Sequence, residues 1–306
     1  MLKPISSVKL YVVDAFTTEP NTGNRAGVVL DAADLTEQQM QEIAAFAGYS
    51  ETAFVLPPTD SSHDLHVRYF TPTSEVPICG HATVATHFLR ASLGHQDEYP
   101  LVVKTGAGNL PVELTGENEP LLVTMTQGQV EFSEHFDANQ RRELAVALGI
   151  KESDFADWPI QIVSTGHSKV MVPLRPENAQ SRDILDGLKP NNEKLSAISA
   201  EIGCNGFFPF VLEGTRQEPV TYGRMFAPAI GIDEDPVTGN ANGPAGAYLV
   251  HHDLIECENE VSYWGHQGIA IGKAGRILVN VKKLDSELKV KISGQAVLVG
   301  TREATV

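Results

Sequence analysis

The stretch Arg68-Tyr-Phe-Thr-Pro72, followed by Cys79-Gly-His-Ala-Thr83, occurs a second time in altered form. Its counterpart reads Arg224-Met-Phe-Ala-Pro228, followed by Thr238-Gly-Asn-Ala-Asn242. The two Arg-x-Phe-x-Pro signatures are 156 residues apart, and the glycines that follow them are 159 residues apart. A fixed offset of about half the chain predicts two similar halves. Short motifs also match by chance, so similar turn patterns without a repeat remain the alternative.

Two further pairs share the offset of 156 residues. Phe54-Val-Leu56 recurs as Phe210-Val-Leu212, and the helix start predicted at Thr36 recurs at Asn192. Segments rich in Val, Ile, Phe and Tyr between turn residues predict strands. These segments are 9–14, 26–30, 52–56, 65–70, 101–104, 121–125, 161–163, 169–172, 207–211, 277–281 and 296–299.

Helices are predicted at fewer places. The segments 36–47 and 137–148 open with capping boxes, and each stops at a glycine. A third helix is expected over 192–202, and two more begin near His81 and Asn240. These last two are rich in Ala, Gly, Val and Leu and lack the charged face of a solvent-exposed helix, so we expect them to be buried.

Each half is therefore β-rich around one internal helix, which predicts two similar α+β domains. The boundary is expected near residues 118–120, which gives a first lobe over 1–120 and a second lobe from 121 onward. The full length of 306 residues agrees with two domains of ~150 residues each.

Composition excludes several classes of function. Lys and Arg number 23 and Asp and Glu number 39, so the net charge is −16, which disfavours nucleic acid and anionic membranes as partners. No apolar run approaches the ~18–20 residues that span a bilayer, and the start of the sequence lacks a signal pattern. Three cysteines without a Cys-x-x-Cys spacing disfavour a disulfide framework and fit a reducing cytoplasm.

Motifs for cofactors and metals do not occur either. The chain has no Gly-x-Gly-x-x-Gly after a strand, no Gly-x-x-x-x-Gly-Lys-[Ser/Thr] and no His-Glu-x-x-His helix. We therefore expect neither a cofactor nor a bound metal.

The two internal helices suggest an anion site. A helix N-terminus offers free amide hydrogens and the positive end of the dipole, so two such turns, at Gly80 and Gly239, would bind a small anionic substrate. An ordinary helix start with glycine is the alternative. The substrate-binding residues predicted at these turns are Cys79, Gly80, Ala82, Thr238, Gly239, Asn240 and Ala241.

Glu51 is the predicted acid/base residue. It lies among small and apolar residues in Tyr49-Ser-Glu-Thr-Ala-Phe-Val55, and at the offset of 156 residues its counterpart is Phe207. A partly desolvated carboxyl group is suited to taking and returning a proton near neutral pH. One such group in only one half fits a single asymmetric site, although an exposed residue at a strand start would also fit the pattern.

Three other side chains are candidates. His81, at the start of a helix, is favoured in its neutral form and could relay a proton, or it could simply pack there. Asp235 precedes Pro236 and could orient a neighbouring group or cap amides. A helix start activates a thiol such as Cys79, but the other half has Thr238 at that place, so a two-thiol mechanism is excluded and a packing role is open. The turns 165–168 and 265–268 could also line the site, or be ordinary loops.

These motifs together resemble the phenazine-biosynthesis PhzF-like family, and most closely its YddE-type members. The resemblance rests on the following segments: Asp14-Ala-Phe16, Gly23-Asn24, Ser50-Glu-Thr52, Arg68-Tyr-Phe-Thr-Pro72, Glu75-Val-Pro-Ile-Cys-Gly-His-Ala-Thr83, Arg224-Met-Phe-Ala-Pro228 and Glu234-Asp-Pro-Val-Thr-Gly-Asn-Ala241.

The resemblance implies a diaminopimelate-epimerase-like fold. In that fold, two pseudo-symmetric lobes each wrap a β-barrel-like sheet around a central helix, with the active site between them. It also implies that the last strand, within 290–306, returns to the first lobe, so that the second lobe covers 121–289. It further implies that the protein is a homodimer and that its chemistry is a cofactor-free isomerisation. The family's catalytic Glu, Gly-His pair and Asp correspond to Glu51, Gly80-His81 and Asp235. Asn240 stands where the family has serine, so the phenazine precursor is not assigned as substrate.

We therefore expect a cytoplasmic, cofactor-independent isomerase that moves a proton between carbons of a small carboxylate-bearing substrate. Glu51, His81 and Asp235 are its predicted catalytic residues. Two alternatives remain open at this point: a binding protein that kept the fold without catalysis, and an epimerase-like enzyme with the single thiol of Cys79.

Overall fold

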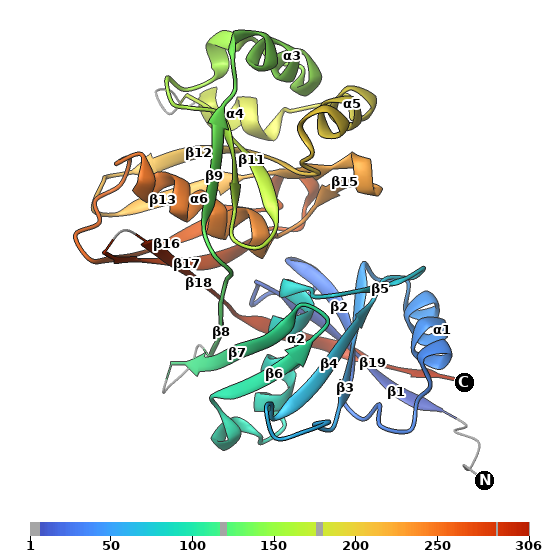
Figure 1. Ribbon diagram of the computed structural model, residues 1–306. Helices are drawn as coiled ribbons and strands as arrows, with labels where there is room; N and C mark the ends of the chain where they lie inside the picture. The colour runs from blue at the N-terminus through green and yellow to red at the C-terminus, as the bar shows by residue number, and fades with distance from the viewer. Residues whose placement is uncertain (1–6, 117–120, 176–179, 286, 306) are drawn as a thin grey trace. The chain divides into compact units, whose positions relative to one another are not determined.

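The computed structural model describes residues 7–116, 121–175, 180–285 and 287–305 (Figure 1). The chain divides into two compact units. Unit 1 comprises Met1–Thr126 and Ser293–Val306, and unit 2 comprises Gln127–Ile292. The boundary expected around 118–120 lies outside the described residues. Within the described part, no helix is both long enough and apolar enough to cross a membrane.

Unit 1 is built on a sheet of mixed strand directions. Its strands pair in the order β19–β1–β2–β3–β4–β6–β7–β8, and the short β5 pairs with β4. The bounds are β1 (Val8–Ala15), β2 (Asn24–Val29), β3 (Glu51–Leu56), β4 (Leu65–Phe70), β5 (Glu75–Val76), β6 (Leu101–Thr105), β7 (Gly108–Thr115), β8 (Leu122–Thr126) and β19 (Ala296–Ala304).

Unit 2 has a comparable sheet. Its strands pair in the order β9–β10–β11–β12–β13–β16–β17, and β14 pairs with β12 and β15. The bounds are β9 (Glu131–His135), β10 (Gln161–Ser164), β11 (Ser168–Pro173), β12 (Phe207–Gly214), β13 (Pro219–Gly223), β14 (Met225–Ala227), β15 (Ile232–Asp235), β16 (Glu260–Gln267), β17 (Gly275–Leu284) and β18 (Glu287–Gly294).

The strand pairings confirm the internal repeat. From β1 to β6 the successive pairs are antiparallel, parallel, antiparallel and parallel, and the pairs from β10 to β16 follow the same sequence. Glu51 is the first residue of β3, and Phe207 is the first residue of β12, as the offset of 156 residues predicts. The acid/base candidate and this phenylalanine therefore occupy equivalent places in the two units.

A buried helix lies at the centre of each unit. In unit 1, α2 (Gly80–Ser92) packs against β1, β2, β3, β8 and β19; in unit 2, α6 (Gly239–His251) packs against β10, β11 and β17. The small residues of α6 permit this approach, because a Cβ on Gly246 would lie 2.6 Å from a methyl group of Val279. The expectation of two internal helices is confirmed.

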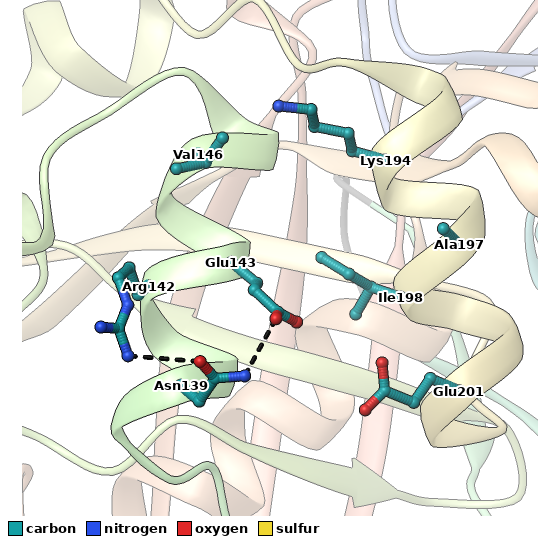
Figure 2. Close-up of a pocket in the computed structure, with 8 residues that line it drawn as sticks. All are labelled: Asn139, Arg142, Glu143, Val146, Lys194, Ala197, Ile198 and Glu201. Carbon is teal, nitrogen blue, oxygen red and sulfur yellow. Dashed lines mark hydrogen bonds between the residues drawn. The ribbon is translucent and has the colours of Figure 1, made fainter.

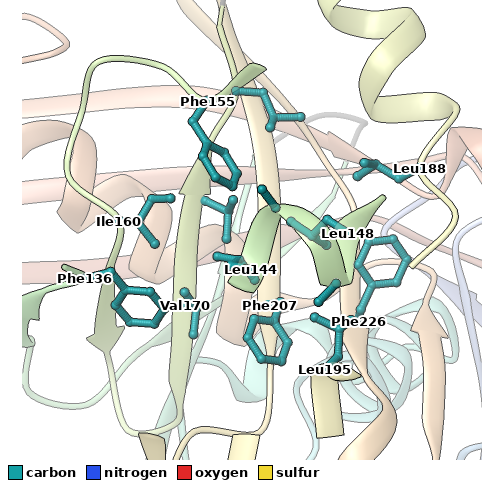
Figure 3. Close-up of a cluster of buried hydrophobic side chains, with 14 of the residues drawn as sticks. Phe136, Leu144, Leu148, Phe155, Ile160, Val170, Leu188, Leu195, Phe207 and Phe226 are labelled. Carbon is teal, nitrogen blue, oxygen red and sulfur yellow. The ribbon is translucent and has the colours of Figure 1, made fainter. Parts of the chain in front are cut away.

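Other helices cover the outer faces of the sheets. In unit 1, α1 (Glu37–Ala47) packs through Met40 and Ile43 against strand residues that include Phe54. In unit 2, α3 (Ala138–Leu148) and α5 (Asn192–Ile202) cover β11 and β12 in a second hydrophobic cluster (Figure 3). The remaining helical segments are α4 (Gln180–Asp186), η1 (Gln96–Glu98), η2 (Glu152–Asp154), η3 (Pro228–Ile230) and η4 (Ile269–Ile271).

The bounds of α5 match the predicted range 192–202, but its alignment with α1 differs by one residue from the predicted repeat. Its N-cap is Asn191, whose side chain accepts a hydrogen bond from the backbone of Lys194, whereas the N-cap of α1 is Thr36, as predicted. The helix pair therefore has an offset of 155 residues, not 156. Adjacent asparagines at 191 and 192 made the capping residue ambiguous from sequence alone.

Candidate functional site

Three predicted residues meet at the N-terminus of α2 in unit 1. The Nε2 atom of His81 lies 3.3 Å from a carboxylate oxygen of Glu51, and its Nδ1 atom lies 3.4 Å from the sulfur of Cys79. The Oγ atom of Ser50 also lies 3.3 Å from Nε2 of His81. One imidazole thus contacts a carboxylate, a thiol and a hydroxyl group.

The cluster is mostly shielded from water. The side chain of Glu51 is 17% exposed and that of His81 is 9% exposed, and Cys79 is buried. Of these three side chains, Glu51 has the largest exposed fraction, and the neighbouring Ser50 is exposed. Glu51 is therefore partly desolvated, in agreement with the prediction from its apolar surroundings.

Backbone geometry and a buried hydroxyl chain fix the turn before α2. Cys79 is the N-cap in an extended conformation, and its carbonyl accepts a hydrogen bond of 2.7 Å from the hydroxyl of Thr83. That hydroxyl also lies 2.7 Å from the hydroxyl of Tyr69, and burial raises the pKa of Tyr69, so the phenol stays protonated. Neutral partners on β4 and α2 therefore hold the Cys79 turn in place.

The other residues predicted at this turn contribute backbone. Gly80 is the first residue of α2 and is half-buried, whereas Ala82 is fully buried. The first turn of an α-helix leaves its amide hydrogens without acceptors inside the helix, and the dipole makes this end positive. The turn is suited to a carboxylate or to a developing negative charge.

In unit 2, hydrogen bonds with the side chain of Gln267 hold the equivalent turn. The hydroxyl of Thr238 donates to the carboxylate of Asp235, and the side chain of Gln267 donates to the Asp235 carbonyl at 2.8 Å. The amide of Thr238 donates to Gln267 Oε1 at 3.1 Å, and Asn242 donates to the same oxygen at 2.9 Å. The Asp235 carboxylate thus accepts a hydrogen bond from a side chain of the turn before α6.

A second glutamine holds the start of α6. The side-chain nitrogen of Gln127 donates to the Gly239 carbonyl at 3.1 Å and to Asn240 Oδ1 at 3.3 Å. With its oxygen engaged in this way, Asn240 keeps its amide nitrogen as a donor for a ligand. Ala241 is fully buried, and its amide donates to the Thr238 carbonyl at 3.2 Å.

Lys169 adds a cation to unit 2. Its ammonium group donates to the Ser168 carbonyl at 3.0 Å, and a Cβ on Gly206 would lie 2.3 Å from its stem. Burial lowers the pKa of Lys169, and electrostatic interactions with Cys204 and Asp235 oppose this only in part. Lys169 and Asp235 therefore interact electrostatically near the turn before α6.

A groove in unit 2 lies apart from these residues. It has a volume of about 450 Å³ and is lined by side chains of α3 and α5 alone (Figure 2). Its walls combine apolar Val146 and Ile198 with charged Arg142, Glu143 and Glu201. None of the predicted site residues lines it, so we do not assign the chemistry to this groove.

The sequence predicted the main site residues of each unit but not several of the side chains that contact them. Glu51, Cys79 and His81 come together in unit 1, and Asp235 and Thr238 come together in unit 2. Ser50, Gln127 and Lys169 were not predicted. Gln267 belongs to one of the two turn-rich stretches named as possible lining, which was its only signal. Gln127 is 112 residues from Gly239, and no local spacing reveals such a contact.

Known proteins similar to this chain identify its family. The family model of the phenazine biosynthesis-like proteins, PhzC-PhzF, matches residues 13–302. The chain belongs to this family. Its relatives include the uncharacterized isomerase YddE of Escherichia coli strain K12, 48% identical over 95% of this chain and 96% of the relative. The trans-2,3-dihydro-3-hydroxyanthranilate isomerase of Pseudomonas chlororaphis is 32% identical, over 94% of this chain and 96% of that enzyme's length.

Solved structures agree with this assignment. The Bacillus anthracis phenazine biosynthesis protein of the PhzF family superposes with a TM-score of 0.87 at 35% identity, over 99% of this chain and 100% of the other. A hydroxyproline epimerase from Agrobacterium vitis has a TM-score of 0.61 at 11% identity, over 99% and 92% of the two chains, which shows a shared fold. The predicted epimerase-like fold class is confirmed, and the chain is an isomerase of the PhzF type.

Proposed function

We propose that this isomerase moves a proton between two carbons of a small carboxylate-bearing molecule, with Glu51 as the group that takes and returns the proton. The observation that supports this most directly is the contact of 3.3 Å between Glu51 and His81 at the N-terminus of a buried helix. The chemistry needs no cofactor, because a carboxylate can remove a proton beside a carbonyl or conjugated system when the resulting charge is stabilised.

The surroundings of Glu51 fit each step. A hydrogen bond donated from Nε2 of His81 to Glu51, across the contact of 3.3 Å, would stabilise the carboxylate form, which accepts a proton. The amides of the α2 turn would stabilise the negative charge that develops on the substrate, and such a donor contributes roughly 3–4 kcal/mol in the transition state. His81 is thus assigned to orientation or relay of the proton, and Glu51 to its transfer.

Unit 2 contributes substrate binding in this proposal. In the turn of Thr238, Gly239, Asn240 and Ala241, the amides of Thr238 and Ala241 are bonded within the protein, so an anionic group would bind the amides of Gly239 and Asn240 and the side chain of Asn240, with the nearby Lys169 as a source of positive charge. Asp235 orients Thr238 through their hydrogen bond. That the turns of both units bind one substrate stays a prediction.

The test is incorporation of solvent deuterium. In deuterium oxide, the chain is incubated with trans-2,3-dihydro-3-hydroxyanthranilate and with a panel of unsaturated and amino-acid-derived carboxylates, and exchange is followed by NMR. For a substrate found in this way, Glu51→Gln is expected to lose at least about a hundredfold of the rate, since positioned acid/base groups contribute about 10²–10⁴-fold. Glu42→Gln, on the exposed face of α1, is the matched control. Full exchange in Glu51→Gln refutes the assignment.

One observation supports a second candidate. The sulfur of Cys79 lies 3.4 Å from Nδ1 of His81, so the pair could instead act as a thiol acid/base. In that case Cys79→Ser and thiol alkylation abolish exchange while Glu51→Gln retains it. The two variants thus distinguish a carboxylate mechanism from a one-thiol epimerase.

A further inference from the structure

The cluster at the α2 turn carries the ligand set of a metal site. Glu51, Cys79 and His81 each offer one ligand atom, and these three atoms lie within 4.8 Å of one another. Sulfur, imidazole nitrogen and carboxylate oxygen are the three donor types that Zn²⁺ accepts in proteins. Among the described residues, this is the one place where three such side chains converge.

The separations suit tetrahedral zinc. Zinc lies about 2.3 Å from sulfur and about 2.0–2.2 Å from nitrogen and oxygen, so neighbouring ligand atoms are about 3.3–3.6 Å apart. In the structure, Nε2 of His81 is 3.3 Å from the Glu51 oxygen and 3.8 Å from the Cys79 sulfur. The third pair, the Glu51 oxygen and the Cys79 sulfur, lies within 4.8 Å, and the sulfur is nearer to Nδ1 of His81 than to Nε2, so binding requires the side chains to rotate around the ion and Ser50 to give up its contact with Nε2.

Charge balance also favours the metal. A carboxylate and a thiolate this close repel each other in a shielded site, and a cation bound between them relieves that repulsion. When Zn²⁺ binds, the Cys79 thiol releases one proton to solvent, and the two negative ligands neutralise the ion. Three protein ligands leave the fourth position for water.

We propose that this turn binds Zn²⁺ through Glu51, Cys79 and His81 and that the bound ion switches the enzyme off. The binding itself stands on the ligand geometry. The inhibition rests on the proposed function, because a Glu51 carboxylate that ligates zinc cannot accept a proton from substrate. Sequence patterns predicted no metal, since these ligands do not follow a zinc spacing: Glu51 comes from β3, and Cys79 and His81 come from the α2 turn.

Direct binding tests the site without any substrate. Zn²⁺ is titrated into the reduced full chain in competition with a chromophoric chelator, and Co²⁺ is added separately to detect thiolate-to-cobalt charge transfer in the near ultraviolet. We expect one equivalent of Zn²⁺ and a charge-transfer band. Cys79→Ser and His81→Gln should each weaken binding by at least about a hundredfold, beyond the roughly 10–100-fold that loss of an outer partner costs.

Matched variants exclude other sites on the chain. The double variant Cys204→Ser/Cys257→Ser removes the other two thiols, and His251→Gln alters the group of His135, His251 and His252, whose rings lie close together. Both variants should retain binding and the cobalt band. Absence of stoichiometric binding, or binding that survives Cys79→Ser, overturns the site.

The outcome also separates this inference from the proposed function. Glu51→Gln should weaken Zn²⁺ binding whether or not Glu51 transfers a proton. If Zn²⁺ does not bind but Glu51→Gln still abolishes exchange, only the metal site is refuted. If Zn²⁺ binds but Glu51→Gln still exchanges deuterium, the proton-transfer role of Glu51 is refuted. The proposed inhibition is then refuted as well, while the metal site stands.

Discussion

His87 lies fully buried on α2, and its environment disfavours a positive charge. Its Nδ1 atom is 2.7 Å from the hydroxyl of Tyr99, and its Nε2 atom has no hydrogen-bond partner among the described residues. Burial, with a smaller contribution from the charge of Arg90, lowers the pKa of His87 to about 3. The folded chain therefore keeps this imidazole neutral at pH values where an exposed histidine is protonated.

This burial predicts a loss of stability in acid. Below about pH 6.5 the unfolded chain binds a proton at His87 and the folded chain does not, so the free energy of unfolding falls by about 1.4 kcal/mol per pH unit until about pH 3. Urea denaturation at several pH values measures this slope. His87→Gln should reduce the slope of the free energy of unfolding against pH by the contribution of one proton. The substitution His135→Gln, at an exposed position, should leave that slope unchanged. Equal slopes in all three proteins would contradict the prediction.

The candidate site was predictable residue by residue, but its connections were not. Glu51 was identified from its apolar neighbours, and Cys79 and His81 from their place at a helix start. The hydrogen bond between Gln267 and Asn242 depends on how β16 and α6 pack, and that packing leaves no local signature. Lys169 gave no signal, because a lysine in a strand is usually solvent-exposed.

The repeated Arg-x-Phe-x-Pro element has the same structural role in both units. Arg68 makes two hydrogen bonds to Glu75 and lies over the ring of Phe70. Arg224 makes two hydrogen bonds to Glu234 and lies over the ring of Phe226. In each unit, this Arg–Glu pair holds the segment that leads to the internal helix. We call each pair an anchor.

The two anchors differ in burial, and this predicts unequal costs of removal. The Arg224 side chain is 8% exposed and also donates to the carbonyls of Leu185, Asp186 and Leu188 near the end of α4, whereas Arg68 is 19% exposed. Arg224→Met should lower the free energy of unfolding by about 3–5 kcal/mol, because it leaves buried partners unpaired.

Arg68→Met is the matched control. Its pair is more exposed, since Glu75 is 39% exposed, so the loss should be about 1 kcal/mol or less. Guanidinium chloride denaturation of both variants measures the difference. Equal losses would show that the anchors are equivalent in spite of their burial.

Strong local patterns predicted elements well, and weak ones did not. The capping boxes placed α1 and α3 correctly, and the continuous apolar run of β12 reflects a strand buried on both faces. The strand β9 was missed because its residues are largely exposed and polar. It forms through its pairing with β10, which sequence does not show.

Unit 1 is assembled from two distant parts of the chain. The strand β19 pairs with β1 along its length, from Val8 with Ala304 to Ala15 with Ala296. Ala304 is buried within the hydrophobic cluster that α1 covers.

Unit 2 is continuous in sequence and contains both tryptophans, Trp158 and Trp264. Tryptophan fluorescence therefore monitors unit 2, and circular dichroism monitors the whole chain.

This arrangement predicts that a change in β19 destabilises unit 1. Ala304→Asp places an unpaired charge in the unit 1 cluster and should cost about 3–5 kcal/mol. Thr301→Asp adds the same charge at an exposed position of β19 and is the control. Hydrogen exchange should show lost protection in β1 and β2 for Ala304→Asp. Retained protection there, or an equal effect of Thr301→Asp, would contradict the prediction.

The pairing of β1 with β19 also has a consequence for biogenesis. Translation delivers β1 first and β19 only after the whole of unit 2 has been synthesised. On the ribosome, the nascent unit 1 must therefore wait with an open β1 edge while unit 2 emerges and folds. That waiting period is when an unpaired strand edge is exposed to chaperones and to other nascent chains.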